Sequence, residues 1–195
     1  MRIMRLGLLA VAALLLGSAS ASAVNVKKRI EAPGLPTEVW AVAGAFCAIK
    51  SWHPAVAECA ETKEGDVTFR TLTLKDGAKI KEKLTETGDL TYSYEIVESP
   101  LPVKNYKAKF WMEEDDEPDR SVIYWEADFD AADGTSDDDA QKVIRGIFTD
   151  GVKGVKKNAI MAHDAREKKA GTAADHLPPV RGDDDDDDDD GDDKK

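Results

Sequence analysis

The sequence predicts an α+β fold in which a curved antiparallel sheet wraps around one long helix near the C-terminus. Three observations predict it. Alternating apolar and polar residues recur in short runs between residues 56 and 130, and turn residues separate these runs. A series of hairpins of this kind is typical of an antiparallel meander. A wide apolar stripe at helical spacing then follows between residues 136 and 163.

One strand and two short helical segments are expected before the meander. Residues 24–30 alternate as a strand, and residues 33–36 hold two prolines and a glycine that end it. Apolar residues at helical spacing predict a helix over 37–46 and a helical turn over 48–52. This turn ends at His53, because the residue before a proline avoids helical geometry.

The meander itself is expected to have six strands, over residues 56–61, 66–74, 79–87, 90–98, 104–113 and 121–130. Lys75-Asp76-Gly77 is a hairpin signal between two of them. The final helix is expected to begin at Ser136, whose hydroxyl suits an N-cap, with three aspartates at the positive end of the helix dipole. We expect it to end near His163.

The first residues have the pattern of a cleaved export signal. Arg2 and Arg5 precede a short apolar run over residues 6–16, and Ala21-Ser22-Ala23 is a small-x-small cleavage site. The run is short for a membrane anchor, which is the alternative. We expect cleavage after Ala23 and a bacterial protein that is periplasmic or secreted. Nothing after residue 23 is apolar enough to cross a membrane.

The remaining chain is expected to hold one domain over residues 24–163, a polar linker over 164–182 and a disordered tail over 183–195. The whole sequence has a net charge of −12, to which ten Asp and two Lys of the tail contribute −8. This charge repels phosphates, so we expect no nucleic-acid partner. Carboxylates suit hard cations such as Ca²⁺. The tail is therefore either a weak metal site or a segment that solubilises the protein or steers a partner. The weak metal candidates are Asp183, Asp184, Asp185, Asp186, Asp187, Asp188, Asp189 and Asp190.

The sequence holds two cysteines, Cys47 and Cys59. In an oxidising compartment an even pair predicts a disulfide. Two buried free thiols are the alternative. Two cysteines alone are too few for a zinc site, and no motif for an organic cofactor is present, so we expect no cofactor.

Polar residues stand on strand faces that are otherwise apolar. Glu82 shares a face with Ile80 and Leu84, and Arg70 shares one with Leu72. A buried carboxylate is costly unless it is paired or protonated, so Glu82 either faces a wet cavity or pairs with Arg70 or His53. His53 either donates a hydrogen bond to a ligand or bonds a backbone carbonyl. The candidate ligand-binding residues are His53, Arg70, Leu72, Glu82, Tyr92, Tyr94, Tyr106, Phe148 and Val152.

The order of elements resembles that of the START/Bet v 1-like (SRPBCC) superfamily, in particular its polyketide cyclase/dehydrase branch. The resemblance covers about residues 24–160, and the plant abscisic-acid receptors are more distant relatives. It is carried by Trp52-His53-Pro54 to Cys59, Arg70 to Leu74, Glu82-Lys83-Leu84, Tyr92-Ser93-Tyr94, Pro100-Leu101-Pro102 and Asn105-Tyr106.

This resemblance implies a helix-grip fold with a ligand cavity between the sheet and the last helix, reached between the loops at Asp76-Gly77 and Ser99–Pro102. It also implies that a basic group at His53 meets a ligand acid, that Glu82 contacts ligand through water and that Tyr106 lines the cavity. The loop at Asp76-Gly77 is short and lacks the gate sequence of the hormone receptors.

Three functions are compatible with these features. The first is an exported protein that binds a small hydrophobic or aromatic molecule or a lipid. The second is a cyclase- or dehydratase-like enzyme in which Glu82 or His53 moves a proton. The third, which the resemblance implies, is a periplasmic accessory protein of the methanol-oxidation type whose acidic tail steers a basic partner or collects metal ions. Binding without catalysis is the expectation.

Overall fold

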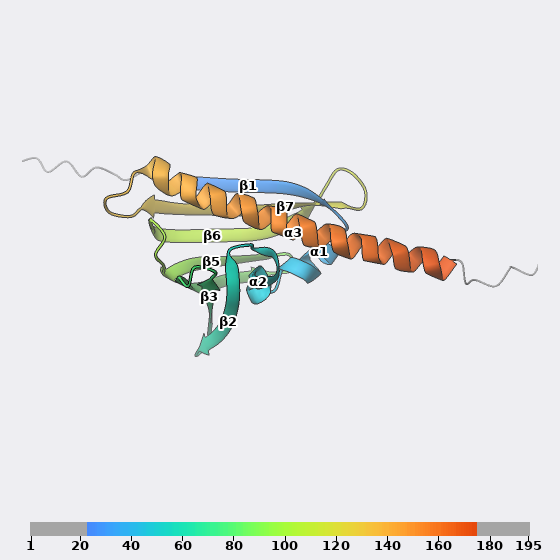
Figure 1. Cartoon of the computed structure of the whole chain (residues 1–195), viewed down its shortest axis with the longest axis horizontal. Helices are drawn as coiled ribbons and strands as arrows, with labels where there is room; N and C mark the ends of the chain where they lie inside the picture. Colours follow the sequence, from blue (N-terminus) through green and yellow to red (C-terminus); the bar gives the residue numbers. More distant parts are fainter. Residues whose placement is uncertain (1–22, 175–195) are drawn as a thin grey trace, which may run out of the picture.

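We describe a computed structural model of the protein, in which residues 23–174 are described. The expected signal segment, most of the expected linker and the Asp-rich tail lie outside these residues. Figure 1 shows one curved sheet with a long helix lying along it. The elements in chain order are β1 (Val24–Pro33), α1 (Pro36–Ala43), η1 (Phe46–Ala48), α2 (Ile49–Trp52), β2 (Val56–Glu64), β3 (Val67–Leu74), β4 (Lys79–Gly88), β5 (Thr91–Glu98), β6 (Val103–Glu114), β7 (Arg120–Ala131) and α3 (Asp137–Ala174).

The predicted α+β helix-grip architecture is confirmed. All seven strands are antiparallel and lie in the order β1-β7-β6-β5-β4-β3-β2. The sheet curls, so that β2 runs across the direction of β1, β7 and β6 (Figure 1). Helix α3 packs on β1 and β7, and α1 and α2 pack against α3. The hydrophobic core fills the space between the sheet and these helices.

The first helix is shorter than expected. It ends at Ala43 rather than at residue 46, and Ala45 takes an extended conformation before the short turn of η1. This break turns Phe46 towards the sheet, where its carbonyl accepts a hydrogen bond from Arg70 and its ring lies 4.0 Å from the Arg70 guanidinium carbon. A tertiary contact with a buried cation therefore outweighs helical continuity.

The last helix is longer than expected. Ser136 caps it as predicted, since its hydroxyl accepts a hydrogen bond from the amide of Asp139. The expected end near His163 is wrong, because α3 continues to Ala174 and includes the first part of the expected polar linker. Arg166 holds the extension through ion pairs with Glu38 and Asp119.

The expected disulfide is confirmed: Cys47 and Cys59 are bonded, with their α-carbons 5.5 Å apart. The bridge ties η1 to the edge strand β2, and such a bond is typical of proteins that fold in oxidising compartments. Among the described residues, no helix is both long enough and apolar enough to span a membrane.

Candidate functional site

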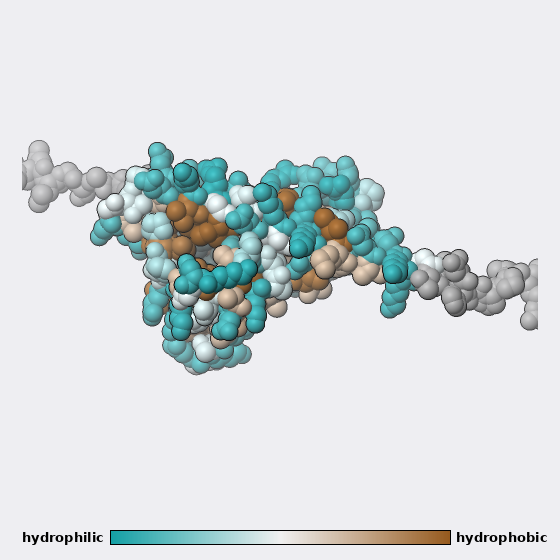
Figure 2. All heavy atoms as spheres, in the orientation of Figure 1, coloured by the Kyte–Doolittle hydropathy of each residue, from teal (hydrophilic) through white to brown (hydrophobic). Residues whose placement is uncertain are grey.

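A small cavity of about 70 Å³ lies between the curved sheet and α3. Its walls come from α2 and the segment after it, from β2 to β7 with the loop between β5 and β6, and from the first half of α3. Most of the lining is apolar, and Figure 2 shows hydrophobic atoms exposed along the first half of α3. The lining residues are Ile49, His53, Ala55, Val56, Leu72, Leu74, Ile80, Glu82, Tyr94, Ile96, Leu101, Tyr106, Trp125, Ile144 and Ile147.

Glu82 reaches this cavity from β4 and is held by a buried arginine. Arg70 lies directly opposite it on β3, and the Arg70 Nε donates a hydrogen bond to Glu82 Oε2. Arg70 is 0% exposed and Glu82 only 5%. The Arg70 guanidinium also lies against the Phe46 and Tyr94 rings. Its Nη2 has no hydrogen-bond partner among residues 23–174.

Burial disfavours the charged form of both residues, but it changes the pKa of only one of them in that direction. Burial raises the pKa of the Glu82 carboxyl, and the charge of Arg70 offsets this only in part. Burial opposes the charge on Arg70, but the attraction and hydrogen bond of Glu82 together with the nearby Tyr92 and Tyr94 outweigh it and raise the pKa of Arg70. The cavity wall therefore carries a carboxyl group that is more easily protonated than an exposed one, beside a guanidinium that stays charged.

Two tyrosines and a tryptophan form a chain of hydrogen bonds at the cavity. The indole Nε1 of Trp125 donates to the hydroxyl oxygen of Tyr94 at 2.9 Å, and that oxygen lies 3.4 Å from the hydroxyl oxygen of Tyr106. Burial raises the pKa of both tyrosines, so both hydroxyls stay protonated. Only one of these two hydroxyls can donate its proton to the other. One O–H therefore has no acceptor among the described residues.

A bulge in β6 precedes Tyr106. The register with β7 shifts between Lys104 and Lys107, and Asn105 adopts a positive φ of 54°. The Asn105 amide donates a hydrogen bond to Asp130 at 2.7 Å, which holds this turn of the backbone. Bulges re-aim side chains in this way next to binding sites. Tyr106 lies on the inner face of the sheet with Ala108, both of them buried.

His53 is buried, and both of its ring nitrogens are engaged. The backbone amide of Ala55 donates to Nδ1 at 3.2 Å, so Nδ1 is the acceptor. Nε2 therefore carries the proton and donates to the carbonyl of Ile147 on α3 at 3.1 Å. Burial lowers the pKa of His53, and the bond to Ile147 only partly opposes this. The geometry fits the alternative in which His53 bonds a backbone carbonyl, and the neutral side chain links the end of α2 to α3.

The structure brings five of the nine candidate ligand-binding residues together in the cavity lining: His53, Leu72, Glu82, Tyr94 and Tyr106. The other four lie behind the lining. Arg70 is covered by its aromatic neighbours, and Tyr92 packs against Phe46 and Phe110. Phe148 stacks on Trp125 with ring centroids 4.3 Å apart, and Val152 is part of the general core.

Sequence reasoning missed much of the apolar wall. Trp125 is not among the nine candidates, yet it lines the cavity and supplies the indole donor. The residues of α3 that line the cavity are Ile144 and Ile147 instead of Phe148 and Val152. All four belong to one helical stripe, and spacing alone does not tell which part of a wide stripe faces a hollow. Leu101 lines the cavity from the loop at Ser99–Pro102, which was expected at the entrance.

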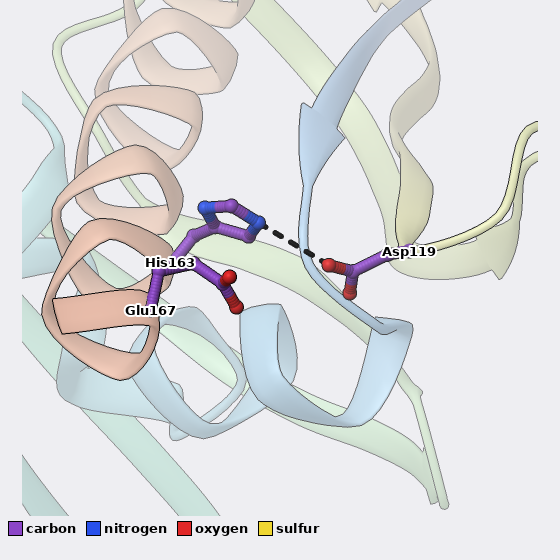
Figure 3. A group of neighbouring side chains, drawn as sticks. All are labelled: Asp119, His163 and Glu167. Atoms are coloured by element: carbon purple, nitrogen blue, oxygen red, sulfur yellow. Dashed lines mark hydrogen bonds and ion pairs between the residues drawn. The ribbon is translucent and has the colours of Figure 1, made fainter. Parts of the chain in front are cut away.

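A second group of polar side chains lies where α3 meets the loop before β7. Figure 3 shows Asp119, His163 and Glu167, whose ligand atoms lie within 4.8 Å of one another. His163 Nε2 is 3.2 Å from Asp119 Oδ2. Arg166 also pairs with both carboxylates, at 2.5 Å from Asp119 and 3.1 Å from Glu167. A cation from the chain itself thus offsets part of the negative charge of the group, and its ion pairs fasten α3 to the loop.

A model of the family described as polyketide cyclase/dehydrase and lipid transport matches residues 23–159 of the chain. No curated protein matches the sequence of this chain.

Solved structures with the same architecture are similar to this chain. The protein XoxI from Bacillus cereus is 29% identical to it, with a TM-score of 0.66 over 70% of this chain and 96% of that one. The ZhuI aromatase/cyclase from Streptomyces sp. R1128 is 12% identical, with a TM-score of 0.60 over 77% and 99% of the two chains. A START superfamily protein from Mycobacterium smegmatis is 10% identical, with a TM-score of 0.59 over 70% and 97%. At such low identity, the last two show likeness of fold alone.

Proposed function

The chain belongs to the polyketide cyclase/dehydrase and lipid transport family, and on this premise we propose that it is an exported protein that binds a small hydrophobic molecule between the sheet and α3. The molecule carries a hydrogen-bond acceptor at one end. One observation carries this proposal: an O–H of the Tyr94–Tyr106 pair lacks an acceptor in a cavity whose lining is mostly apolar. A buried donor without a partner is costly, and a ligand oxygen would remove that cost.

The size of the cavity restricts the ligand. About 70 Å³ holds only a few heavy atoms, whereas pockets for drug-sized ligands measure roughly 300–1,000 Å³. The ligand is therefore small, and its binding widens the cavity. Leu101 and Ile147 are half-buried at its margin, and Leu101 lies in a loop rather than in a strand. We expect these two side chains to move when the ligand enters.

Export is supported by the bond between Cys47 and Cys59, since disulfides are rare where thiols are kept reduced. The signal segment lies outside the described residues, so cleavage after Ala23 stays a prediction. Sequencing the N-terminus of protein purified from the periplasm would test it.

A titration with two probes of similar shape tests the binding proposal. Acetophenone has a carbonyl acceptor, whereas ethylbenzene has none. We expect calorimetry to show that acetophenone binds about 2- to 10-fold more tightly, as one neutral hydrogen bond would provide. Equal affinity for the two probes would contradict the role of the tyrosine donor, and failure of both to bind would contradict a usable cavity.

Two matched variants locate the binding site. Ile147→Phe adds volume at the cavity wall, whereas Val143→Phe adds the same kind of ring at an exposed position on α3, one turn earlier. Ile147→Phe should weaken acetophenone binding at least several-fold, and Val143→Phe should leave it unchanged. Equal losses in the two variants would place the probe outside the cavity. Circular dichroism confirms that both variants are folded.

Proton transfer in a cyclase- or dehydratase-like reaction is a second candidate function. The observation that favours it is the raised pKa of Glu82 in the cavity wall, because such groups are suited to acid–base work. The test is mass spectrometry of any molecule that copurifies with the protein, before and after incubation. Loss of one water, or a changed fragmentation pattern at constant mass after ring closure, would support catalysis if it disappears in Glu82→Gln while circular dichroism shows that this variant is folded. An unchanged molecule would support binding alone. The accessory role with a basic protein partner rests on the tail outside residues 23–174 and stays a prediction.

A further inference from the structure

A groove of about 480 Å³ lies on the outer side of the segment that follows α2. Four lysines line it: Lys50 from α2, Lys75 from the turn after β3, and Lys153 and Lys157 from α3. All four are exposed. Asp150 is the only carboxylate in this lining. The groove therefore carries an excess of positive charge on a protein whose net charge is −12.

These lysines have no ion-pair partner within the part of the chain that the structure describes. Some lysines elsewhere are paired, such as Lys104 with Asp133 and Lys83 with Glu95. Others, such as Lys63, have no ion-pair partner among residues 23–174, so what distinguishes the four groove lysines is that they gather in one hollow. Three elements that are distant in sequence bring the four lysines to one hollow. Clustered like charges repel one another, so a counter-charge from elsewhere would stabilise the arrangement.

The chain has such a counter-charge in its own C-terminal segment, which lies outside the described residues. This acidic segment, residues 183–193, holds ten aspartates and no cation. It follows α3 after only eight residues, 175–182.

The acidic segment can reach the groove. At about 1.5 Å per helical residue, Lys157 lies about 26 Å before Ala174 along α3, and Lys153 about 32 Å before it. Fully extended, residues 175–182 span at most about 28 Å. The sixteen residues from Ala174 to Asp190 have an r.m.s. span of about 20–24 Å as a flexible chain. This r.m.s. span is a little shorter than the distance to Lys157, but the full extension of the same residues exceeds the distances to both lysines, so the acidic segment can reach the groove by extending.

We propose that the acidic segment of residues 183–193 docks onto the lysine groove of the same chain. A tethered segment has an effective concentration on the order of millimolar, which gives it an advantage over free anions in solution. The contact is electrostatic, so it weakens as salt is added. It does not depend on the ligand of the cavity.

Paramagnetic relaxation measures this contact directly. A nitroxide attached to Gly191→Cys labels one site, because the two native cysteines are bonded to each other. At low ionic strength we expect selective broadening of the backbone amide signals of Lys50, Lys75, Lys153 and Lys157. The broadening should disappear in 1 M NaCl, where the Debye length is about 3 Å.

Two double variants with the same change of charge distinguish binding at the groove from nonspecific attraction of the acidic segment to the positive charge of the protein. Lys153→Glu/Lys157→Glu should abolish the broadening at all four groove positions. Lys107→Glu/Lys109→Glu makes the same change of charge on exposed residues of β6, outside the groove lining, and should leave the broadening intact. No broadening at the groove, or equal effects of the two double variants, would overturn the proposal.

Two further outcomes would assign the groove to another occupant. Broadening in a mixture of ¹⁵N-labelled protein without nitroxide and unlabelled protein with nitroxide would mean that the segment docks onto a second copy. Cosedimentation with phosphatidylglycerol vesicles, with loss of the intramolecular broadening, would assign the groove to anionic lipid. Each result would overturn docking within one chain, and its absence is expected.

Discussion

Arg70 and Glu82 lie opposite each other on β3 and β4 as a buried ion pair, and only Glu82 reaches the cavity. The pair thus links the framework of the fold to the surface that a ligand would meet. Arg70 has no access to solvent, so its charge depends on Glu82, on the carbonyl of Phe46 and on the aromatic rings around it. Neither charge is expected to tolerate loss of the other.

Removing one charge of this pair should destabilise the fold strongly. Glu82→Gln leaves the Arg70 guanidinium buried without a counter-charge, and we expect a loss of about 3–5 kcal/mol in the free energy of unfolding. Arg70→Met/Glu82→Leu removes both charges, and its stability should return to about that of the native protein or exceed it. Urea denaturation of the two variants measures this. A double variant less stable than Glu82→Gln would contradict the account.

His53 should make stability depend on pH near neutrality. Burial lowers its pKa below the ordinary value of 6.5. Below pH 6.5 the unfolded chain takes up a proton that the folded chain does not, so the free energy of unfolding falls as the pH drops towards the folded pKa. The contribution is complete above pH 6.5. Between pH 7.5 and 5.5 the native protein should lose more stability than His53→Gln, which cannot titrate. Parallel urea curves at the two pH values provide the measurement, and equal losses would show that His53 is not the cause.

Two glycines allow α3 to approach its neighbours. A β-carbon at Gly154 would lie 1.7 Å from the carbonyl oxygen of Trp52, and one at Gly151 would lie 2.4 Å from the Trp125 ring. Gly154→Ala should therefore cost about 1–3 kcal/mol or more, because backbone atoms must move. Gly146 on the same helix has open space around it. Gly146→Ala should stabilise the protein by about 0.5–1 kcal/mol. Thermal unfolding would refute this if both substitutions shifted the melting temperature in the same direction.

Arg166 should hold the last turns of α3 in place. It pairs with Glu38 and Asp119, and hydrogen bonds from Arg166 lower the pKa of both carboxyls. The fastening is therefore complete above about pH 4.5 and is lost as the pH falls through the lowered values. At pH 7, Arg166→Met should speed amide hydrogen exchange over residues 160–171. Lys169→Met, an exposed change on the same segment, should not. Similar exchange in the two variants would show that helix propensity alone maintains this end.

The sequence predicted best which strand residues face the inside of the sheet. An alternation of period two leaves few choices, so the inward positions of Leu72, Glu82, Tyr94 and Tyr106 followed from their neighbours. The same reasoning left a wet cavity, Arg70 and His53 as alternatives for Glu82, and the register places Arg70 opposite it. Local patterns also predicted the cap at Ser136 and the disulfide.

What the sequence could not show depends on contacts between distant residues. Trp125 donates to Tyr94 from a strand 31 residues away, and nothing local to Trp125 indicates that bond. The end of α3 was misplaced because residues 164–174 are polar. The partners that support Arg166 are Glu38 and Asp119, 128 and 47 residues away. The volume of the cavity is also a sum over many side chains, so no single motif determines it.

The central claim is that a small molecule enters the space between the sheet and α3. Intermolecular NOEs from acetophenone to methyl-labelled protein test it most directly. We predict NOEs to the methyl groups of Ile80, Ile96, Ile144 and Ile147, which line the cavity. NOEs confined to Val97 and Val143, which are exposed beside Ile96 and Ile144, would contradict it, as would their complete absence at a saturating concentration of the probe.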